Sequence, residues 1–409
     1  MSTLNVDKVD PSTGTALEIG TSGDTITVPS GATFVVAGTT EITGTNNVQR
    51  PNANPLIING DMAVAQRATS VAGLTNGSDV YAALDRFGFN EYGAPSSIHT
   101  MTQESLSSGN AFADGFANAL KMDVTTAQDP LSAADATMII YKFEGQDLQL
   151  IKKGTANAEK LTLAFWVKGT KVGTHICELF DKDNTRTCSQ SYTVDSTDTW
   201  EHKVVNFPAD TTGIFGDDNA RSLDISFFLS AGTNYTSGSL QTSWGAYSAT
   251  ESAVGQVNTC DSDSNNFHIT GVQLEVGEYT SSTIPPFQHE SYGDNLQRCQ
   301  RYYNRLNVNA IYNAAISIGA MYSTTTAYGM VYLSTPMRTT PTADFTLATD
   351  YFCFNRDSAG DNFDSFSLGG ASNQQYDLYA SGNLSGTATA SGRLRFNSTS
   401  ARIAATAEL

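Results

Sequence analysis

The sequence is short of charged residues, and most of all of basic ones. Only 16% of the 409 residues are charged, and 23 Lys and Arg stand against 41 Asp and Glu, which gives a formal net charge of -18. Proteins that bind phosphate backbones replace counterions with Lys and Arg, so a chain of this charge is repelled by such backbones. Nucleic acid is therefore excluded as an expected partner.

Long apolar runs, secretion signals and cysteine motifs are also missing. No window approaches the roughly 18 apolar residues of a membrane-spanning helix, and the opening MSTLNVDKVDPSTG has neither the basic nor the apolar part of a signal peptide. The five cysteines never form a CxxC pair, which argues against a disulfide framework and a zinc site. We expect a chain that is made in a cytoplasm, does not insert into a membrane, and binds neither a metal ion nor a cofactor.

Catalytic motifs are absent as well. The sequence contains no HExxH, GxSxG or P-loop motif. Two carboxylate pairs, Glu275 with Glu278 and Asp361 with Asp364, invite comparison with the paired acids of glycosidases. Closeness along the chain is poor support for such a pair, because the two acids must face a common substrate. We therefore expect no catalytic residue and no enzymatic activity, and we keep polysaccharide cleavage as the alternative.

The chain is rich in Thr, Ser, Asn, Gly and aromatic residues, which fits short strands joined by tight turns. We predict a mainly β protein in which residues 51–290 form a jelly-roll-like β-sandwich. The segments IINGDM and VQLEVG resemble the first and last strands of carbohydrate-binding jelly rolls, and in some of those families these strands share a structural calcium ion. Asn59, Asp61 and Glu275 lie near the predicted first and last strands and could offer oxygen atoms to a structural calcium ion. Three oxygens fall short of the six to eight that calcium takes, so no metal site is expected.

Residues 1–50 form a polar leader with a short internal repeat. Ile26, Phe34 and Ile42 are eight residues apart, and glycines separate them. Each unit is a short strand that buries one narrow face and cannot form a core alone, so it needs neighbours from other copies. We predict an N-terminal trimeric β-repeat shaft with trimer contacts at these three residues. A flexible Gly/Thr leader is the alternative.

Residues 291–306 contain the one stretch that favours a helix, GDNLQRCQRYYNRL. Asp294 and Gln297 form a plausible capping pair at its start. Apolar residues at spacings of three and four then define one seam: Leu296, Cys299, Tyr303 and Leu306. Either this linking helix packs on its own sandwich, or three copies meet on a symmetry axis between two β domains. We predict the axial arrangement, with the four seam residues as trimer contacts.

Residues 307–409 return to short strands and are predicted to form a C-terminal β-sandwich, the receptor-binding tip. This part holds 13 Tyr and Phe but no Lys and no Trp. Aromatic faces beside amide and carboxylate groups are the chemistry that binds neutral sugars. The predicted ligand-binding residues are four aromatic residues of the tip and one tryptophan of the sandwich: Tyr351, Phe354, Tyr376, Tyr379 and Trp244. For each of them, a place in the core is the alternative.

Five segments together resemble tail fibre proteins of marine bacteriophages, particularly those that infect cyanobacteria: SGDTITVPSGATFVVAGT, NPLIINGDMAVAQRAT, FEGQDLQLIKKGTANAEKLTLAFWVKG, GVQLEVGEYTSSTIPPFQHESYGDNLQRCQRYY and ARIAATAEL. The resemblance implies a homotrimeric fibre whose N-terminus attaches to the virion, at the phage tail or an adaptor protein. Its distal β domains would bind a host surface polysaccharide or an outer-membrane receptor. The alternatives are a polysaccharide-degrading tailspike, a fibre attached to the capsid, and a free carbohydrate-binding module of a bacterial surface protein.

Overall fold

The computed structural model describes residues 54–75, 77, 79–306, 312–356 and 359–409. The predicted shaft of residues 1–50, with Ile26, Phe34 and Ile42, lies outside the described residues and stays a prediction. Among the helices that the structure describes, none is both long and apolar enough to cross a membrane.

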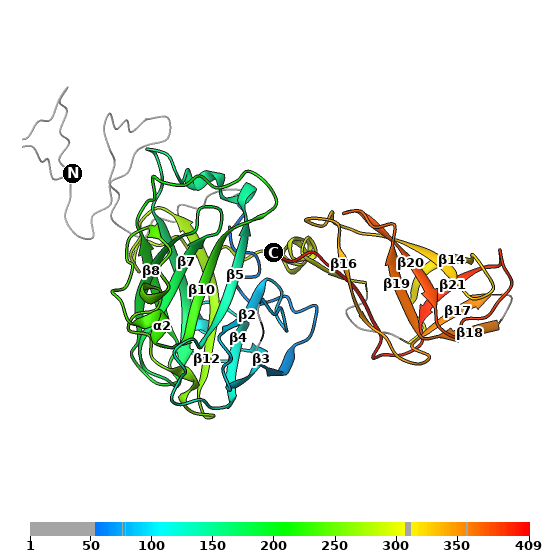
Figure 1. Cartoon of the computed structure of the whole chain (residues 1–409), viewed down its shortest axis with the longest axis horizontal. Coiled ribbons are helices and arrows are strands. Elements are labelled where there is room, and N and C mark those ends of the chain that lie inside the picture. Colours follow the sequence, from blue (N-terminus) through cyan, green and yellow to red (C-terminus); the bar gives the residue numbers. More distant parts are fainter. Residues whose placement is uncertain (1–53, 76, 78, 307–311, 357–358) are drawn as a thin grey trace, which may run out of the picture. The chain divides into compact units, whose positions relative to one another are not determined.

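The sandwich consists of two six-stranded antiparallel sheets (Figure 1). In spatial order the first sheet contains β1 (Ser70–Leu74), β3 (Ile98–Ser105), β4 (Asn118–Thr126), β12 (Asn266–Val276), β6 (Leu161–Gly169) and β9 (Glu201–Phe207). The second sheet contains β11 (Gly245–Ala246), β8 (Arg186–Val194), β7 (Gly173–Asp181), β10 (Arg221–Ala231), β5 (Ala136–Glu144) and β2 (Phe87–Tyr92). The short helical turns between the strands are α1 (Asn110–Ala113), η1 (Gly145–Ile151), α2 (Thr233–Thr236), η2 (Ala249–Glu251) and η3 (Thr259–Asp261).

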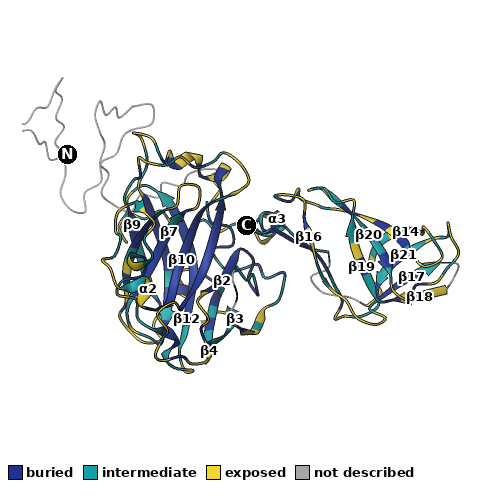
Figure 2. Ribbon diagram, in the orientation of Figure 1, coloured by how far each residue is buried: buried dark blue, intermediate teal, exposed yellow. Residues whose placement is uncertain are grey.

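Alternation along the strands explains how the sandwich forms its core. In β10, Ile225 and Phe227 are buried in the main core, whereas Asp224 and Ser226 belong to the opposite face of the strand. The ring of Phe165 in β6 of the first sheet lies 5.0 Å from that of Phe227, so aromatic residues of both sheets meet in the core. Figure 2 shows the long central strands as buried. The predicted mainly β fold with a β-sandwich is confirmed.

The helix after the sandwich is shorter than predicted. It is α3 (Tyr292–Gln300), and the chain then forms β13 (Tyr303–Arg305), which pairs with β22 (Arg402–Thr406). Ser291 caps the helix, since its Oγ accepts a hydrogen bond from the backbone N–H of Asp294 at 3.2 Å. A helix is therefore present where one was predicted, but it ends at Gln300 rather than at residue 306, and its cap is Ser291 rather than Asp294. Pairing with a strand about a hundred residues away ends the helix, and local periodicity does not report such pairing.

Helix α3 packs against the sandwich of its own chain. Cys299 is fully buried in a small cluster with Ile58 and Val64. The backbone N–H of Asn59 donates a hydrogen bond to Oδ1 of Asn295, a buried helix residue, at 3.1 Å. The first described segment of the sandwich therefore holds the helix by both apolar and polar contacts.

The four predicted seam residues do not lie on one helical face. Tyr303 is in β13 and, like Cys299, has no exposed surface within the single chain. Leu306 packs against the core of the C-terminal unit, and Leu296 is half-buried beside the α3 cluster. Cys299 and Tyr303 are thus already covered by their own chain, as in the local-packing alternative. The homotrimer itself stays a prediction.

The C-terminal unit combines a seven-stranded sheet with the three-stranded sheet that contains β13. The larger sheet contains β18 (Ala359–Phe363), β17 (Phe352–Arg356), β21 (Ser391–Phe396), β14 (Ala315–Met321), β15 (Ala327–Tyr332), β20 (Gln375–Ser381) and β19 (Ser365–Gly369). The smaller sheet has the order β13, β22 and β16 (Thr342–Thr346). Residues of both sheets share one core, in which Phe352 and Ile403 are fully buried. The boundaries predicted for the domains stay predictions.

The last residues leave the C-terminal unit and bind the sandwich. The carboxylate of Glu408 accepts hydrogen bonds from Arg67 at 3.1 Å and from Arg86 at 2.6 Å. Nζ of Lys142, in β5, donates to the carbonyl oxygen of Leu409 at 2.5 Å. Arg86 and Lys142 are almost completely buried. The chain therefore enters the C-terminal unit through β13 and returns through the neighbouring strand, β22.

Candidate functional site

A hollow of about 420 Å³ opens on the outer face of the second sandwich sheet, opposite to the core. Strands β2, β5, β7 and β10 supply its floor, and residues 235–252, which follow β10, supply part of its wall. We call it the outer-face hollow. Its floor side chains are the alternate ones that strand pleating turns away from the core.

Two aromatic pairs flank the hollow. Tyr92 of β2 and Tyr235 of α2 are stacked, with ring centroids 6.1 Å apart. Phe180 of β7 and Tyr247 meet edge to face at 5.5 Å. Tyr92 is 43% exposed and Tyr247 is 40% exposed, so each pair presents ring surface to solvent. Because each ring leans on a second ring, the exposed aromatic surface is held in place before any ligand arrives.

Two acidic side chains lie on the floor between these pairs. Glu178 of β7 is opposite Ser226 of β10, and Asp224 is opposite Phe180, so the two acids are diagonal neighbours on the same face. Burial raises the pKa of Glu178 to about 7, and hydrogen bonds from serine hydroxyls only partly counter it. Burial also raises the pKa of Asp224. At neutral pH the floor can therefore both donate and accept hydrogen bonds.

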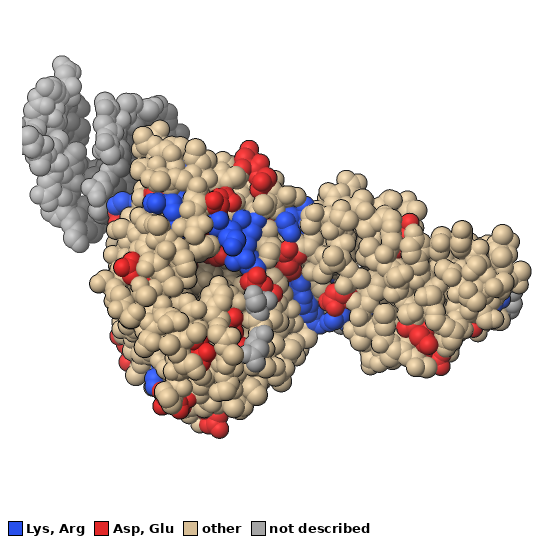
Figure 3. Space-filling model, viewed as in Figure 1, with Lys and Arg blue, Asp and Glu red and all other residues tan. Residues whose placement is uncertain are grey.

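Arg221 and Asp79 complete the charged part of the hollow. Two nitrogens of Arg221 donate to the two carboxylate oxygens of Asp224, at 2.7 and 2.5 Å, and a third lies 3.6 Å from Asp79. Asp79 in turn lies 3.0 Å from Nζ of Lys142. Figure 3 shows basic and acidic atoms side by side on this face of the sandwich, whereas fewer charged atoms are visible on the face of the C-terminal unit that the view displays.

The arrangement suits a ligand that has both apolar faces and hydroxyl groups. Aromatic rings can stack on the C–H face of a pyranose ring, while fixed carboxyl, hydroxyl and guanidinium groups pair with its hydroxyls. Sugars have this mixed character. The outer-face hollow is therefore the candidate functional site.

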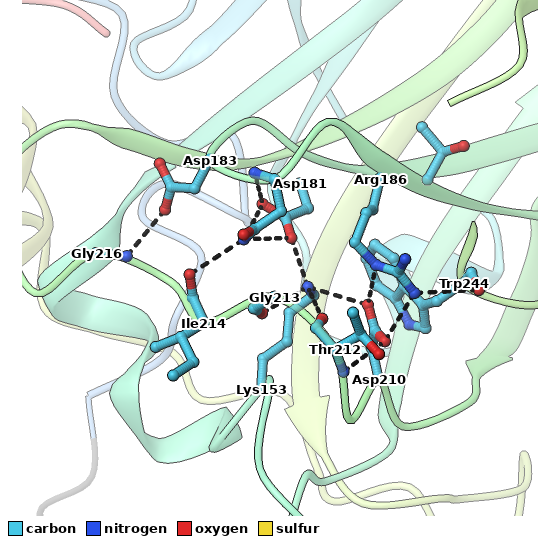
Figure 4. A network of polar contacts seen from close by, with 12 residues as sticks. Lys153, Asp181, Asp183, Arg186, Asp210, Thr212, Gly213, Ile214, Gly216 and Trp244 are labelled. Atoms are coloured by element: carbon cyan, nitrogen blue, oxygen red, sulfur yellow. Dashed lines mark hydrogen bonds and ion pairs between the residues drawn. The ribbon is translucent and has the colours of Figure 1, made fainter. Parts of the chain in front are cut away.

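Trp244, one of the predicted ligand-binding residues, lies outside the hollow and is held inward. Its indole N–H donates a hydrogen bond to the carbonyl oxygen of Pro208 at 2.9 Å, and its ring packs against the main core. Nζ of Lys153 lies 5.2 Å from its ring centroid. That buried lysine is bound by Asp181 and by Asp210, which also accepts two hydrogen bonds from Arg186 (Figure 4). Trp244 thus has the place that its core alternative describes.

The predicted ligand-binding residues of the tip separate into inner and outer positions. Phe354 and Tyr376 have no exposed surface and belong to the core of the C-terminal unit, so they cannot touch a ligand in this structure. Tyr351 is half-buried and packs against the same core. Tyr379 lies on the outer face of β20. The prediction for Phe354 and Tyr376 was wrong, because alternation turns these two side chains inward.

Tyr379 belongs to a row of tyrosines on the outer face of the seven-stranded sheet. Its ring lies 4.4 Å from that of Tyr328 in β15, which stacks on Tyr322 at 4.7 Å with only 8° between the planes. A Cβ on Gly369 would come within 2.0 Å of the Tyr379 ring, so glycine at that position leaves room for the ring. Nearby Ile318 is 82% exposed. This tyrosine row is a second exposed aromatic surface, and Asp377 lies two positions from Tyr379 on the same face of β20.

The acids singled out in the sequence have structural partners. Glu278 pairs with Lys160 at 2.6 Å on the surface, and Asp364 accepts a hydrogen bond from the backbone of Asp350 at 2.8 Å. Asp361 accepts one from the backbone of Ser385 at 2.6 Å. None of them lines the outer-face hollow, so neither predicted carboxylate pair contributes to this site.

The oxygens considered for calcium are also engaged. Oδ1 of Asn59 accepts a hydrogen bond from the backbone of Val64 at 2.8 Å, and Oδ1 of Asp61 accepts one from Asn295 at 3.1 Å. The side chain or backbone of Glu275 also interacts with another group, so Glu275 is not free either. Within the described ranges, no group of three or more His, Cys, Asp or Glu side chains is arranged to hold a metal ion.

The sequence analysis missed the hollow, although a signal for part of it was present. In CELFDK, Glu178, Phe180 and Lys182 stand at alternate positions, so a strand there carries an acid, an aromatic ring and a base on one face. In LDISFFLS, Asp224 and Ser226 interrupt an otherwise apolar run at the same spacing. Polar residues at every second position of apolar strands would have indicated a functional outer face.

Comparison with known proteins gives neither a matching family model nor a matching curated sequence. Among solved structures, the chain is similar to the enzymatically active domain of tailspike protein 4 of bacteriophage CBA120, with 11% identity and a TM-score of 0.27 over 50% of this chain and 21% of that chain. A putative sugar binding protein from Bacteroides thetaiotaomicron gives 14% identity and a TM-score of 0.29 over 55% of this chain and 100% of that one. A family 11 carbohydrate-binding module of a Clostridium thermocellum cellulase gives 12% identity and a TM-score of 0.26 over 52% and 98%. Because all three TM-scores are low, the function proposed below depends on the side chains of the site.

Proposed function

We propose that the chain is a structural, non-enzymatic fibre protein that binds a host-surface glycan in the outer-face hollow. The observation that carries this proposal is the hollow itself, where two supported aromatic pairs flank a floor of buried carboxyl and hydroxyl groups. Rings that stack on sugars and polar groups that pair with hydroxyls occur together there. The tyrosine row of the C-terminal unit would add a second, weaker contact.

The wider setting of this proposal comes from the resemblance to phage tail fibres. In it, residues 1–50 attach a homotrimer to the virion tail or an adaptor, after assembly in the host cytoplasm, and the β domains face the host envelope. Attachment to the capsid is the alternative for the virion end. Several weak sites on one particle then bind firmly, because each attached site raises the local concentration of the others.

The test is binding of envelope polysaccharides from marine cyanobacteria to the full chain, measured by calorimetry. Tyr92→Ala and Tyr247→Ala, on opposite sides of the hollow, should each weaken binding about tenfold, since a lost ring contact is worth roughly 1 kcal/mol or a little more. The matched control is Tyr292→Ala, because Tyr292 is 57% exposed at the start of α3 and lies outside the hollow. The proposal fails if the two hollow variants bind as well as this control.

Cleavage of the glycan is the second candidate function, and one observation favours it. The raised pKa of Glu178, beside a second acid on the neighbouring strand, is a feature shared with the general acids of glycosidases. The same polysaccharides, incubated with the chain and examined for new reducing ends, decide between the two. New ends that disappear in Glu178→Gln would replace the binding proposal by the enzymatic one.

A further inference from the structure

Lys182 differs from every other lysine that the structure describes. Eight of the nine described lysines lie within 4.0 Å of a carboxylate oxygen: Lys121, Lys142, Lys152, Lys153, Lys160, Lys168, Lys171 and Lys203. Within the described part of the chain, Lys182 alone has no such ion pair. This stands out in a protein with nearly twice as many acidic as basic residues.

The position of Lys182 explains why it has no partner. It directly follows β7, and its backbone N–H donates to the carbonyl oxygen of Ser222 at 2.9 Å, so the strand pairing and its alternation continue to this residue. Its exposed side chain lines the outer-face hollow, and Nζ lies 5.9 Å from the ring centroid of Phe180. The two neighbouring acids are engaged elsewhere, since Asp181 binds Lys153 and Asp183 accepts a hydrogen bond from the backbone of Gly216.

The other charges of the hollow balance one another. Arg221 is bound by Asp224 and also faces Asp79, which in turn pairs with Lys142. Glu178 is held by a serine hydroxyl of β8 rather than by a cation. The hollow therefore contains one positive charge without a protein counter-ion, and that charge lies beside an aromatic pair.

We propose that the glycan bound in the hollow carries an anionic substituent, a carboxylate or a sulfate ester, and that Lys182 is its counter-ion. This inference rests on the proposed function, because the sugar ring itself would lie on the aromatic pairs. The net charge of the chain does not forbid it, since at physiological ionic strength charges more than about 8 Å away are largely screened. A single ammonium close to the ligand then outweighs distant carboxylates.

The experiment uses one envelope polysaccharide from a marine cyanobacterium in three forms: intact, chemically desulfated, and carboxyl-reduced. Calorimetry measures the binding of each form to the full chain and to three variants. Lys182→Gln removes the charge, Lys182→Arg keeps it, and Lys160→Gln removes the same charge from an exposed lysine outside the hollow. The form that has lost its anionic group should bind the wild-type chain about tenfold more weakly than the intact form, as expected for one charge-assisted hydrogen bond. Which treatment weakens binding distinguishes sulfate from carboxylate.

Lys182→Gln should bind the intact polysaccharide only as tightly as the wild-type chain binds the neutralised form. Its affinity for the neutralised form should equal that of the wild-type chain. Lys182→Arg and Lys160→Gln should keep the preference for the intact form. Equal binding of all three forms by the wild-type chain, or a preference that survives in Lys182→Gln, overturns the inference but leaves the proposed function intact. If no form binds, or if Tyr92→Ala and Tyr247→Ala bind every form normally, the proposed function fails first.

Discussion

The outer faces of two sheets in this molecule use aromatic residues in opposite ways. On the second sandwich sheet, aromatic pairs flank a hollow whose floor is charged, with Asp224 and Glu178 almost completely buried. On the seven-stranded sheet, Tyr322, Tyr328 and Ile318 are exposed, and Ile318 is opposite the exposed residue Arg393. Both result from the same alternation of side chains along strands.

The contrast between the charged hollow and the tyrosine row shows that a surface with buried charges depends on the surrounding fold more than a surface of exposed rings does. A buried carboxylate needs nearby cations and hydroxyls, so the hollow exists only while its sheet holds those groups in place. An exposed tyrosine needs little support. Substitutions in the hollow should therefore change stability and its pH dependence, while substitutions in the tyrosine row should change only what the surface can contact.

The largest effect is expected inside the C-terminal unit, where the sequence analysis placed a ligand-binding residue. Phe354→Ala should lower the free energy of unfolding by about 4 kcal/mol, because it removes a fully buried ring and leaves a cavity. Tyr379→Ala, on the outer face, is the control and should cost less than about 1 kcal/mol. Guanidinium unfolding of the full chain measures both values. Similar losses for the two variants would mean that the outer row is part of the core.

The second effect concerns the charged floor. Arg221→Met should destabilise the chain by about 3 kcal/mol, because it leaves the buried carboxylate of Asp224 without its cation. Arg393→Met is matched to it on the other sheet: Arg393 is an exposed residue of β21, and its loss should change stability by less than about 0.5 kcal/mol. If the two variants unfold at the same denaturant concentration, the ion pair of the charged floor does not contribute to the stability of the fold.

The third effect depends on pH. The pKa of Glu178 is raised from 4.5 to about 7 by burial, so the folded state holds its proton more firmly than the unfolded state. This group's contribution to stability is complete below pH 4.5 and is lost as the pH rises through about 7. Glu178→Gln, which stays neutral, should nearly match the wild-type chain at pH 4.5 and exceed it by about 3 kcal/mol at pH 8. Thermal unfolding at both pH values tests this, and a stability difference independent of pH contradicts it.

The smallest effect is expected on the tyrosine row. Tyr322 is 70% exposed, so Tyr322→Ser should change the free energy of unfolding by less than about 0.5 kcal/mol. Chemical denaturation of this variant beside Arg221→Met compares the two outer faces directly. A loss above 1 kcal/mol would show that the row is a structural element after all.

The sequence was sufficient for the sandwich and insufficient for the sites, and single residues show why. Strand alternation depends on neighbours two positions away, which the sequence displays, so residues such as Phe227 could be placed in a core. The same rule separates Tyr376 from Tyr379, since three positions along a strand lead to opposite faces. The prediction instead grouped these two tyrosines by composition, and it was wrong for the buried one.

The helix end and the aromatic pairs of the hollow could not be predicted, because both depend on pairing between distant segments. Tyr303 leaves the helical pattern only because it pairs with Thr406, about a hundred residues away. Tyr92 and Tyr235 meet because β2 and β10 both pair with β5. Such order within a sheet depends on the whole set of strands and has no local signature.

The return of the chain from β22 to the sandwich has a mechanical consequence. A C-terminal unit connected by one strand would transmit any pulling force along a single backbone and could rotate freely about that strand. Here Tyr303 and Thr406 belong to two antiparallel strands that lie side by side, and the second strand is fastened to the sandwich through Glu408 and its two arginines. Force on the C-terminal unit is therefore shared by two strands joined by hydrogen bonds. The paired strands also resist twisting of the C-terminal unit about the connection more than a single strand would.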